Sequence, residues 1–145
     1  QYLLDSGRLN GFQAVFKSDD PVASQLRSAG ILNFVEVYET SEQAQRAWQG
    51  SPKLLAEHFP AYGRIVLENE SSTAVAIGDR FRSFEGTWVS DQLKMPLYSV
   101  VFCRKNTLVG LVLLGGPQDR LIRDGQHYAD LLDKRIRSFG KGLSI

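Results

Sequence analysis

Two apolar runs in the second half of the chain predict a β-hairpin. Residues 98–104 and 107–114 are apolar at most positions, and only Lys105-Asn106 separates them. A two-residue hairpin turn requires a positive φ angle, which Asn tolerates better than most residues. A Gly-Gly-Pro break at residues 115–117 follows, and the amphipathic pattern beyond it predicts a helix that reaches Ile136.

The first half of the chain predicts two strands with a helix between them. Residues 11–17 have the alternation of a short strand, and residues 31–39 predict a strand with two apolar faces, which is typical of an interior position. Between them, Asp20 suits a helix N-cap, Pro21 suits the first helical position, and Gly30 can end the helix.

Two further helices are predicted from their end signals. Thr40 and Gln43 have the spacing of a capping box, in which the two side chains bind each other's backbone N–H groups. Ser51-Pro52 starts a second, short helix with Leu55 and Phe59 facing inward. The predicted buried stripe of the first helix consists of Ala44, Ala47 and Trp48, and Gly50 ends that helix.

Short apolar segments before the hairpin predict more of an antiparallel sheet. We expect strands at residues 64–68, 74–77 and 80–84, an extension of the third at residues 87–89, and a loop at residues 91–96. For the last helix we expect an N-cap at Asp124 and an end at Gly140. Its predicted apolar stripe comprises Tyr128, Leu131, Leu132, Arg135, Ile136 and Phe139.

These elements indicate one α+β domain spanning residues 1–145, with an antiparallel β-sheet flanked by helices. The chain is 43% hydrophobic, and a domain of this length buries about 68–70% of its unfolded surface, so its core needs neither a disulfide nor a metal. No apolar run reaches the 18 residues that a membrane-spanning helix requires.

The charge and the cysteine content of the chain exclude few classes of function. Residues 1–72 carry a net charge of −3 and residues 73–145 a net charge of +4, but no block of five like charges occurs, which favours a mixed solvated surface. Cys103 is the single cysteine, so it forms no internal disulfide. Its neighbour Arg104 points to the other face of the strand and is poorly placed to stabilise a thiolate, which favours an inert thiol.

Candidate catalytic groups are present but isolated. His58 and His127 lie outside any metal-ligand spacing, at a helix end and in the first turn of the last helix, so we expect packing or surface roles. The acidic pair Asp19-Asp20 fits helix capping, and Glu68 and Glu70 lie near a strand end. The Gly-Gly-Pro passage lacks the pattern of a phosphate-binding loop. We therefore expect no catalytic residue, no metal site and no cofactor.

Aromatic residues offer the one candidate binding site. A pocket between the sheet and the last helix would be lined by Trp88, Tyr98, Phe102 and Tyr128, although such residues also build ordinary cores. For nucleic acid, the basic residues Arg80, Arg82, Arg104 and Lys105 could gather on adjacent strands, but the accompanying aromatic pattern of an RNA-binding sheet is missing. We expect no nucleic-acid partner.

Three segments of the second half resemble a pattern in uncharacterised bacterial envelope proteins and lipoproteins. Residues 73–79 match a segment ending in Ile-Gly-Asp, residues 100–106 match a hairpin strand ending in Arg-Lys-Asn, and residues 128–136 match a final helix ending in Arg-Ile. Residues 26–30 fit more loosely, and Cys103 departs from the pattern. The architecture resembles the PsbP-like α/β/α sandwich, named for the extrinsic subunit of photosystem II. The resemblance implies a fold and an extracytoplasmic address, and it carries no catalytic residue.

We therefore expect a non-enzymatic, extracytoplasmic accessory or partner-binding module of an envelope protein or lipoprotein. The alternative is a small-molecule or lipid carrier that uses the aromatic pocket, and a third hypothesis is a hydrolase built on His58 or His127. The chain begins at Gln1, so either a signal peptide or a trimmed boundary could precede it. We expect contact with a membrane only through an N-terminal anchor outside this chain.

Overall fold

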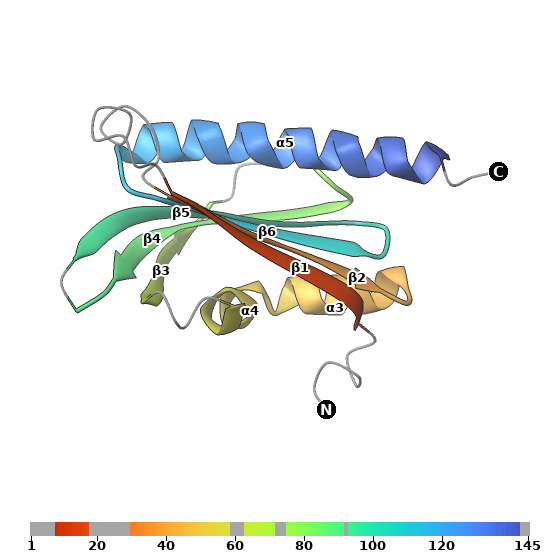
Figure 1. Ribbon diagram of the computed structural model, residues 1–145, viewed down its shortest axis with the longest axis horizontal. Coiled ribbons are helices and arrows are strands. Elements are labelled where there is room, and N and C mark those ends of the chain that lie inside the picture. Colours follow the sequence, from red (N-terminus) through yellow and green to blue (C-terminus); the bar gives the residue numbers. More distant parts are fainter. Residues whose placement is uncertain (1–7, 18–29, 59–62, 72–74, 92, 143–145) are drawn as a thin grey trace.

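The computed structural model describes residues 8–17, 30–58, 63–71, 75–91 and 93–142 (Figure 1). The strands are β1 (Arg8–Lys17), β2 (Gly30–Tyr38), β3 (Arg64–Glu70), β4 (Arg80–Val89), β5 (Lys94–Arg104) and β6 (Thr107–Leu114). They form one antiparallel six-stranded sheet in the order β1-β2-β6-β5-β4-β3. Helices α3 (Ser41–Gln49) and α4 (Ser51–His58) cover one face of this sheet, and α5 (Gln118–Gly142) covers the other (Figure 1). The predicted α+β class, an antiparallel sheet flanked by helices, is confirmed.

The central strands β5 and β6 are apolar at successive positions because helices cover both of their faces. Along β6, Leu108 and Val112 belong to the core on the α3 side, whereas Val109, Leu111 and Leu113 belong to the core beneath α5. A strand that is covered on both faces buries every side chain, so it has a continuous apolar run instead of an alternation. This is the physical reason for the most conspicuous pattern in the sequence.

The hairpin between β5 and β6 is confirmed, with one change at its turn. Arg104 pairs with Thr107, so the turn has two residues as predicted. Among the described non-glycine residues, however, the positive φ angle falls on Lys105, at 54°, and not on Asn106. Asn106 instead ties the turn to the end of β2: its side-chain amide donates to the Tyr38 carbonyl at 2.8 Å, and its own carbonyl accepts from the Tyr38 N–H at 2.8 Å.

The predicted start of α3 is also confirmed. The Thr40 hydroxyl accepts from the Gln43 N–H at 3.2 Å, and the Gln43 side chain accepts from the Thr40 N–H at 3.0 Å. Ala44 is fully buried, and Trp48 packs on the same core while its indole N–H donates to the Val101 carbonyl at 3.1 Å.

The neighbouring helix and strand fit their predictions where they are described. In α4, Leu55 is fully buried as predicted, and Leu54 is buried as well. The predicted interior position of β2 is confirmed, because β2 lies between β1 and β6. Phe59 and the helix predicted after Pro21 lie outside the described residues.

Two boundaries around β4 and β5 were predicted wrongly. Residues 75–77 form no strand, because both edges of β4 are already occupied by β3 and β5; Ile77 is instead buried in the core beneath α5. The predicted loop at residues 91–96 is too long, since β5 already begins at Lys94. Pro96 of β5 comes directly before Leu97, which forms the terminal pair with Leu114 of β6. The Pro96 carbonyl accepts from the Gly115 N–H at 3.0 Å. The extension at residues 87–89 is confirmed as part of β4.

Helix α5 is longer than predicted at both ends. It begins at Gln118 because the Pro117 carbonyl accepts from the N–H groups of Arg120 and Leu121, each at 3.1 Å, so Asp124 is not the N-cap. It continues past Gly140 to Gly142. His127 therefore lies in the third turn and not in the first.

The predicted apolar stripe of α5 is only half right. Leu132 and Ile136 pack toward the sheet, whereas Tyr128, Leu131 and Phe139 are 40%, 48% and 70% exposed. The true inward row repeats every four residues: Leu121, Gly125, Ala129 and Asp133. A glycine and an aspartate in this row carry no hydrophobic signal, so the hydrophobic pattern placed the buried face too far around the helix.

Gly125 lies at a close approach of α5 to the sheet. A Cβ atom at this position would meet ring carbons of Tyr98 at 2.6 and 2.7 Å, and Tyr98 is 1% exposed, so its ring has little room to move.

We expect Gly125→Ala to lower the free energy of unfolding by about 1–2 kcal/mol, because overpacking a closed core outweighs the better helix propensity of alanine. Urea denaturation measures the change. Gly50→Ala is the matched control, since its nearest neighbour would lie at 3.6 Å, and we expect a change within about 0.5 kcal/mol. A Gly125→Ala protein more stable than wild type would contradict this packing argument.

Candidate functional site

A partly buried ion-pair network joins three segments that are distant in the sequence. Asp133 of α5 accepts two parallel hydrogen bonds from Arg104 at the end of β5, one from Nε and one from Nη2, both at 2.8 Å. Asp133 also accepts from the Gly78 N–H at 3.0 Å. The Arg104 Nη1 donates to Asp79 at 3.1 Å. We call Asp79, Arg104 and Asp133, with the Gly78 N–H, the clamp.

Electrostatics within the clamp favour the charged forms of both partners. Burial would raise the pKa of Asp133, whose side chain is fully buried, but the Arg104 hydrogen bonds and the Gly78 N–H outweigh it and hold the pKa below its usual range. The Asp133 bond likewise raises the pKa of Arg104. Arg137 adds a more distant positive charge, with Nε 3.8 Å from Asp133.

The clamp fixes the β5–β6 turn as well as α5. Asp79 accepts from the Lys105 N–H at 2.6 Å, and the Asp79 N–H donates to the Cys103 carbonyl at 2.7 Å. Gly78 has a φ angle of +68°, and a Cβ atom there would lie 2.7 Å from the Cys103 carbonyl, so this approach requires glycine. The oxygens of both carboxylates are engaged in hydrogen bonds within the protein, so the clamp joins α5 to the sheet and to the segment before β4.

Two features of the sequence point to the clamp, but only the fold shows that they meet. Asp133 is the acidic member of a four-residue repeat on α5, and Arg104 ends an otherwise apolar strand. The segments Ile77-Gly78-Asp79 and Arg104-Lys105-Asn106 meet Asp133 at this point.

Cys103 is an inert thiol in this fold. Its side chain is fully buried in the core on the α3 side, whereas Arg104 reaches to α5 on the other side of the sheet. Burial raises the pKa of Cys103 to about 11, and the Asp79 carboxylate acts in the same direction. The predicted inert character is consistent with this environment.

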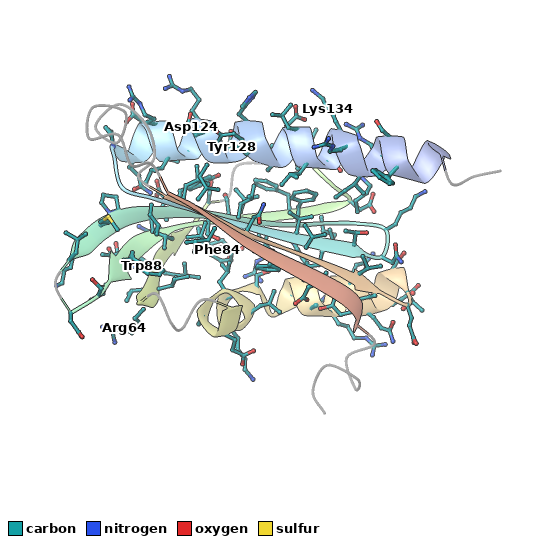
Figure 2. All side chains as sticks on the ribbon, in the orientation of Figure 1. Arg64, Phe84, Trp88, Asp124, Tyr128 and Lys134 are labelled. Carbon is teal, nitrogen blue, oxygen red and sulfur yellow. The ribbon has the colours of Figure 1, made fainter. Side chains whose placement is uncertain are left out.

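The four residues of the predicted aromatic pocket are not brought together (Figure 2). Trp88 belongs to the core between the sheet and helices α3 and α4. Tyr98 and Phe102 lie beneath α5 on the opposite face, where they are 1% and 0% exposed. Tyr128 stands on α5 and is 40% exposed. One pocket between sheet and α5 cannot include Trp88, because the sheet separates Trp88 from the others.

The other candidate residues are also separated. Arg82 bonds to Glu70 at 2.7 and 3.2 Å and lies 5.6 Å from the Trp48 ring centroid, on the α3 side of the sheet, whereas Arg104 is on the α5 side. The basic residues therefore form no single patch of the kind that binds nucleic acid. Glu68 accepts from the Thr87 hydroxyl at 2.7 Å, away from the Glu70–Arg82 pair.

Of the two histidines, only the side chain of His127 is described. His127 is exposed beside the Tyr128 ring, with ring centroids 5.8 Å apart. The side chain of His58 and the pair Asp19-Asp20 lie outside the description. Within the described ranges, no group of three or more metal-ligating side chains gathers, and no helix is long and apolar enough to cross a membrane.

One flank of α5, beside its inward row, is the strongest candidate for a binding surface. It presents a row of six residues at steps of four, four, three, four and four, which we call the outer stripe: Arg120, Asp124, Tyr128, Leu131, Arg135 and Phe139. Its three apolar members are 40%, 48% and 70% exposed. Steps of three and four residues keep these side chains on one side of a helix, so they form a continuous strip about 28 Å long. Figure 2 marks Asp124 and Tyr128 within it.

In comparisons with known proteins, no family model matches this chain, and neither a curated protein nor a solved structure matches it.

We expect Asp133→Asn to lower the free energy of unfolding at pH 7 by about 2–3 kcal/mol, because it removes the buried one of the two carboxylates that pair with Arg104. The folded-state pKa of Asp133 is depressed, so its stabilisation is present above the unfolded pKa of about 3.9 and is lost as pH falls through the folded pKa. The difference in the free energy of unfolding between wild type and variant should therefore decrease when urea denaturation is repeated from pH 6 down to pH 2.

Glu70→Gln is the matched control for this titration. Arg82 lowers the pKa of Glu70 as well, but the Glu70 side chain is 47% exposed, so we expect a loss below about 1 kcal/mol. If the loss of unfolding free energy in Asp133→Asn stays constant over the whole pH range, the carboxylate charge does not stabilise the fold.

We expect the Cys103 thiol to resist a disulfide reagent such as dithionitrobenzoate at pH 8 in the native protein and to react at once in guanidinium chloride, because the native thiol is both buried and protonated. Release of the coloured thiolate measures the rate. Rapid labelling of the folded protein would contradict the environment described for this residue.

Proposed function

We propose that this domain is a non-enzymatic module that binds a protein partner through the outer stripe of α5. The observation that carries the proposal is the exposure of Tyr128, Leu131 and Phe139 along one flank of a helix whose neighbouring side is packed on the sheet. Single exposed apolar residues are common, but three of them along one flank of a helix, interleaved with charged residues, favour an interaction site.

The partner is expected to present a helix. An extended helix surface with apolar side chains at steps of three and four residues is matched by another amphipathic helix, whose side chains pack between those of the first. Charged members of the stripe, Asp124 and Arg135, flank the central apolar pair Tyr128 and Leu131. The partner helix therefore carries an apolar centre with charges of opposite sign at the matching positions.

The chemistry-bearing side chains support a binding role over catalysis. Asp133 and Arg104 bind each other, Cys103 is buried with a pKa of about 11, and His127 lies at the surface without a neighbouring acid that an interaction joins to it. A catalytic site needs a nucleophile, base or acid that can reach a substrate. Arg104 and Asp133 are committed to the clamp, and Cys103 is committed to packing.

An extracytoplasmic address, as an accessory domain of an envelope protein or lipoprotein, is part of the same proposal. Its support is the resemblance of residues 73–79, 100–106 and 128–136 to envelope proteins with a PsbP-like sandwich. The α/β/α layering is compatible with that resemblance. The carrier hypothesis has weaker support, because Tyr98 and Phe102 are closely packed and Trp88 lies on the other face.

We expect a photo-crosslinking amino acid at Leu131 of the full-length protein, expressed in its source cells, to give one discrete product of higher mass after illumination. The same amino acid at Lys53 is the control, because Lys53 is 79% exposed on α4, on the other face of the sheet. Adding Phe139→Asp should abolish the product, since it places a charge in the apolar strip. No product at Leu131, or the same product from Lys53, would overturn the proposal.

A further inference from the structure

The outer stripe of α5 has an internal symmetry that the proposed function does not use. The steps between its members read the same in both directions along the helix, with a midpoint between Ala129 and Asp130. About this midpoint, Tyr128 is related to Leu131, Asp124 to Arg135 and Arg120 to Phe139. A two-fold axis through the midpoint would therefore lay one copy of the stripe antiparallel on another, residue against related residue.

The residues that this symmetry brings together are complementary in kind. At the centre, the Tyr128 ring of each copy meets Leu131 of the other, which buries the two most central apolar side chains. One step outward, the Asp124 carboxylate, which lies 4.0 Å from Arg123 Nε of its own chain, meets the Arg135 guanidinium of the other copy, and this pairing occurs twice. At the ends, the Arg120 guanidinium meets the ring of Phe139, a cation–π pair. No like charges within the stripe oppose each other.

The competing parallel arrangement lacks this complementarity. Two parallel helices related by a two-fold axis place each residue beside its own copy, so Asp124 would face Asp124 and Arg135 would face Arg135. Two like-charge pairs would oppose association, whereas the antiparallel arrangement has two opposite-charge pairs. The charges thus select one orientation for a second copy of the same chain.

On this basis, and resting on the proposed function, we propose that the partner of the outer stripe is a second copy of this chain, which docks antiparallel through α5 to form a two-fold symmetric dimer. The contact is one helix pair, which is small among stable interfaces, so we expect dissociation in the micromolar range. The other parts of the sandwich remain free to carry further contacts.

Charge reversal across the two-fold axis tests the dimer. We expect sedimentation equilibrium of the purified chain to show a reversible dimer at about 200 μM. The Asp124→Arg substitution sets a guanidinium group against Arg135 at both symmetric contacts, and Arg135→Asp sets a carboxylate against Asp124 at both. Each variant should therefore dimerise at least about tenfold more weakly. Lys134→Glu is the control: Lys134 lies on another side of α5, in a pair with Asp130 (Figure 2), and its reversal should leave dimerisation unchanged.

Combining the two charge-reversal substitutions is the decisive experiment. An equimolar mixture of Asp124→Arg and Arg135→Asp restores both opposite-charge pairs across a heterodimer, and the double variant restores them in a homodimer, so both should associate as wild type does. Far-UV circular dichroism confirms that each variant is folded. A wild type that stays monomeric at about 1 mM, or weakened variants that recombination fails to rescue, overturns the antiparallel dimer. In that case a crosslink at Leu131 to a protein of another mass would leave the proposed function standing.

Discussion

The bidentate pair between Arg104 and Asp133 is the contact on which the arrangement of layers depends. Packing alone holds an amphipathic helix against a sheet, but it allows the helix to slide or rotate by a fraction of a turn. The pair removes that freedom, because two parallel hydrogen bonds at 2.8 Å fix both the rotation and the axial position of α5 over the end of β5. A buried carboxylate without this partner would strongly destabilise the folded state.

The clamp is effective because it forms at a crossing of three chain segments. Gly78 and Asp79 enter from the segment before β4, Arg104 ends β5 at the hairpin turn, and Asp133 comes from the middle of α5. The same hairpin turn is bound on its other side to the end of β2 through Asn106. The charged end of the β5–β6 hairpin thus connects the sheet to its helix layer, while the apolar body of the hairpin forms the two cores.

The sequence predicted the features that depend on neighbouring residues. It did not predict which side of the last helix is buried. The capping box at Thr40 and the two-residue turn at Lys105 depend on neighbouring residues, so the sequence alone specified them. The inward row of α5 includes Gly125 and Asp133, whose reasons for burial are the Tyr98 ring and the Arg104 guanidinium from a distant strand. Hydrophobic periodicity cannot detect partners of this kind, and it therefore assigned Tyr128, Leu131 and Phe139 to the core. For the same reason the predicted aromatic pocket combined residues from two faces of the sheet, whereas the outer stripe emerged only when α5 had been placed.

The central claim is that the clamp seats α5 and thereby fixes which side of the helix faces outward. Hydrogen–deuterium exchange on wild type and Asp133→Asn tests it most directly, because exchange reports the stability of each element separately. The account predicts that amides of α5 exchange much faster in the variant under conditions where those of β5 and β6 keep their protection. Equal protection of α5 in both proteins, or a parallel loss in helix and sheet, would contradict the claim that this ion pair holds the helix in place.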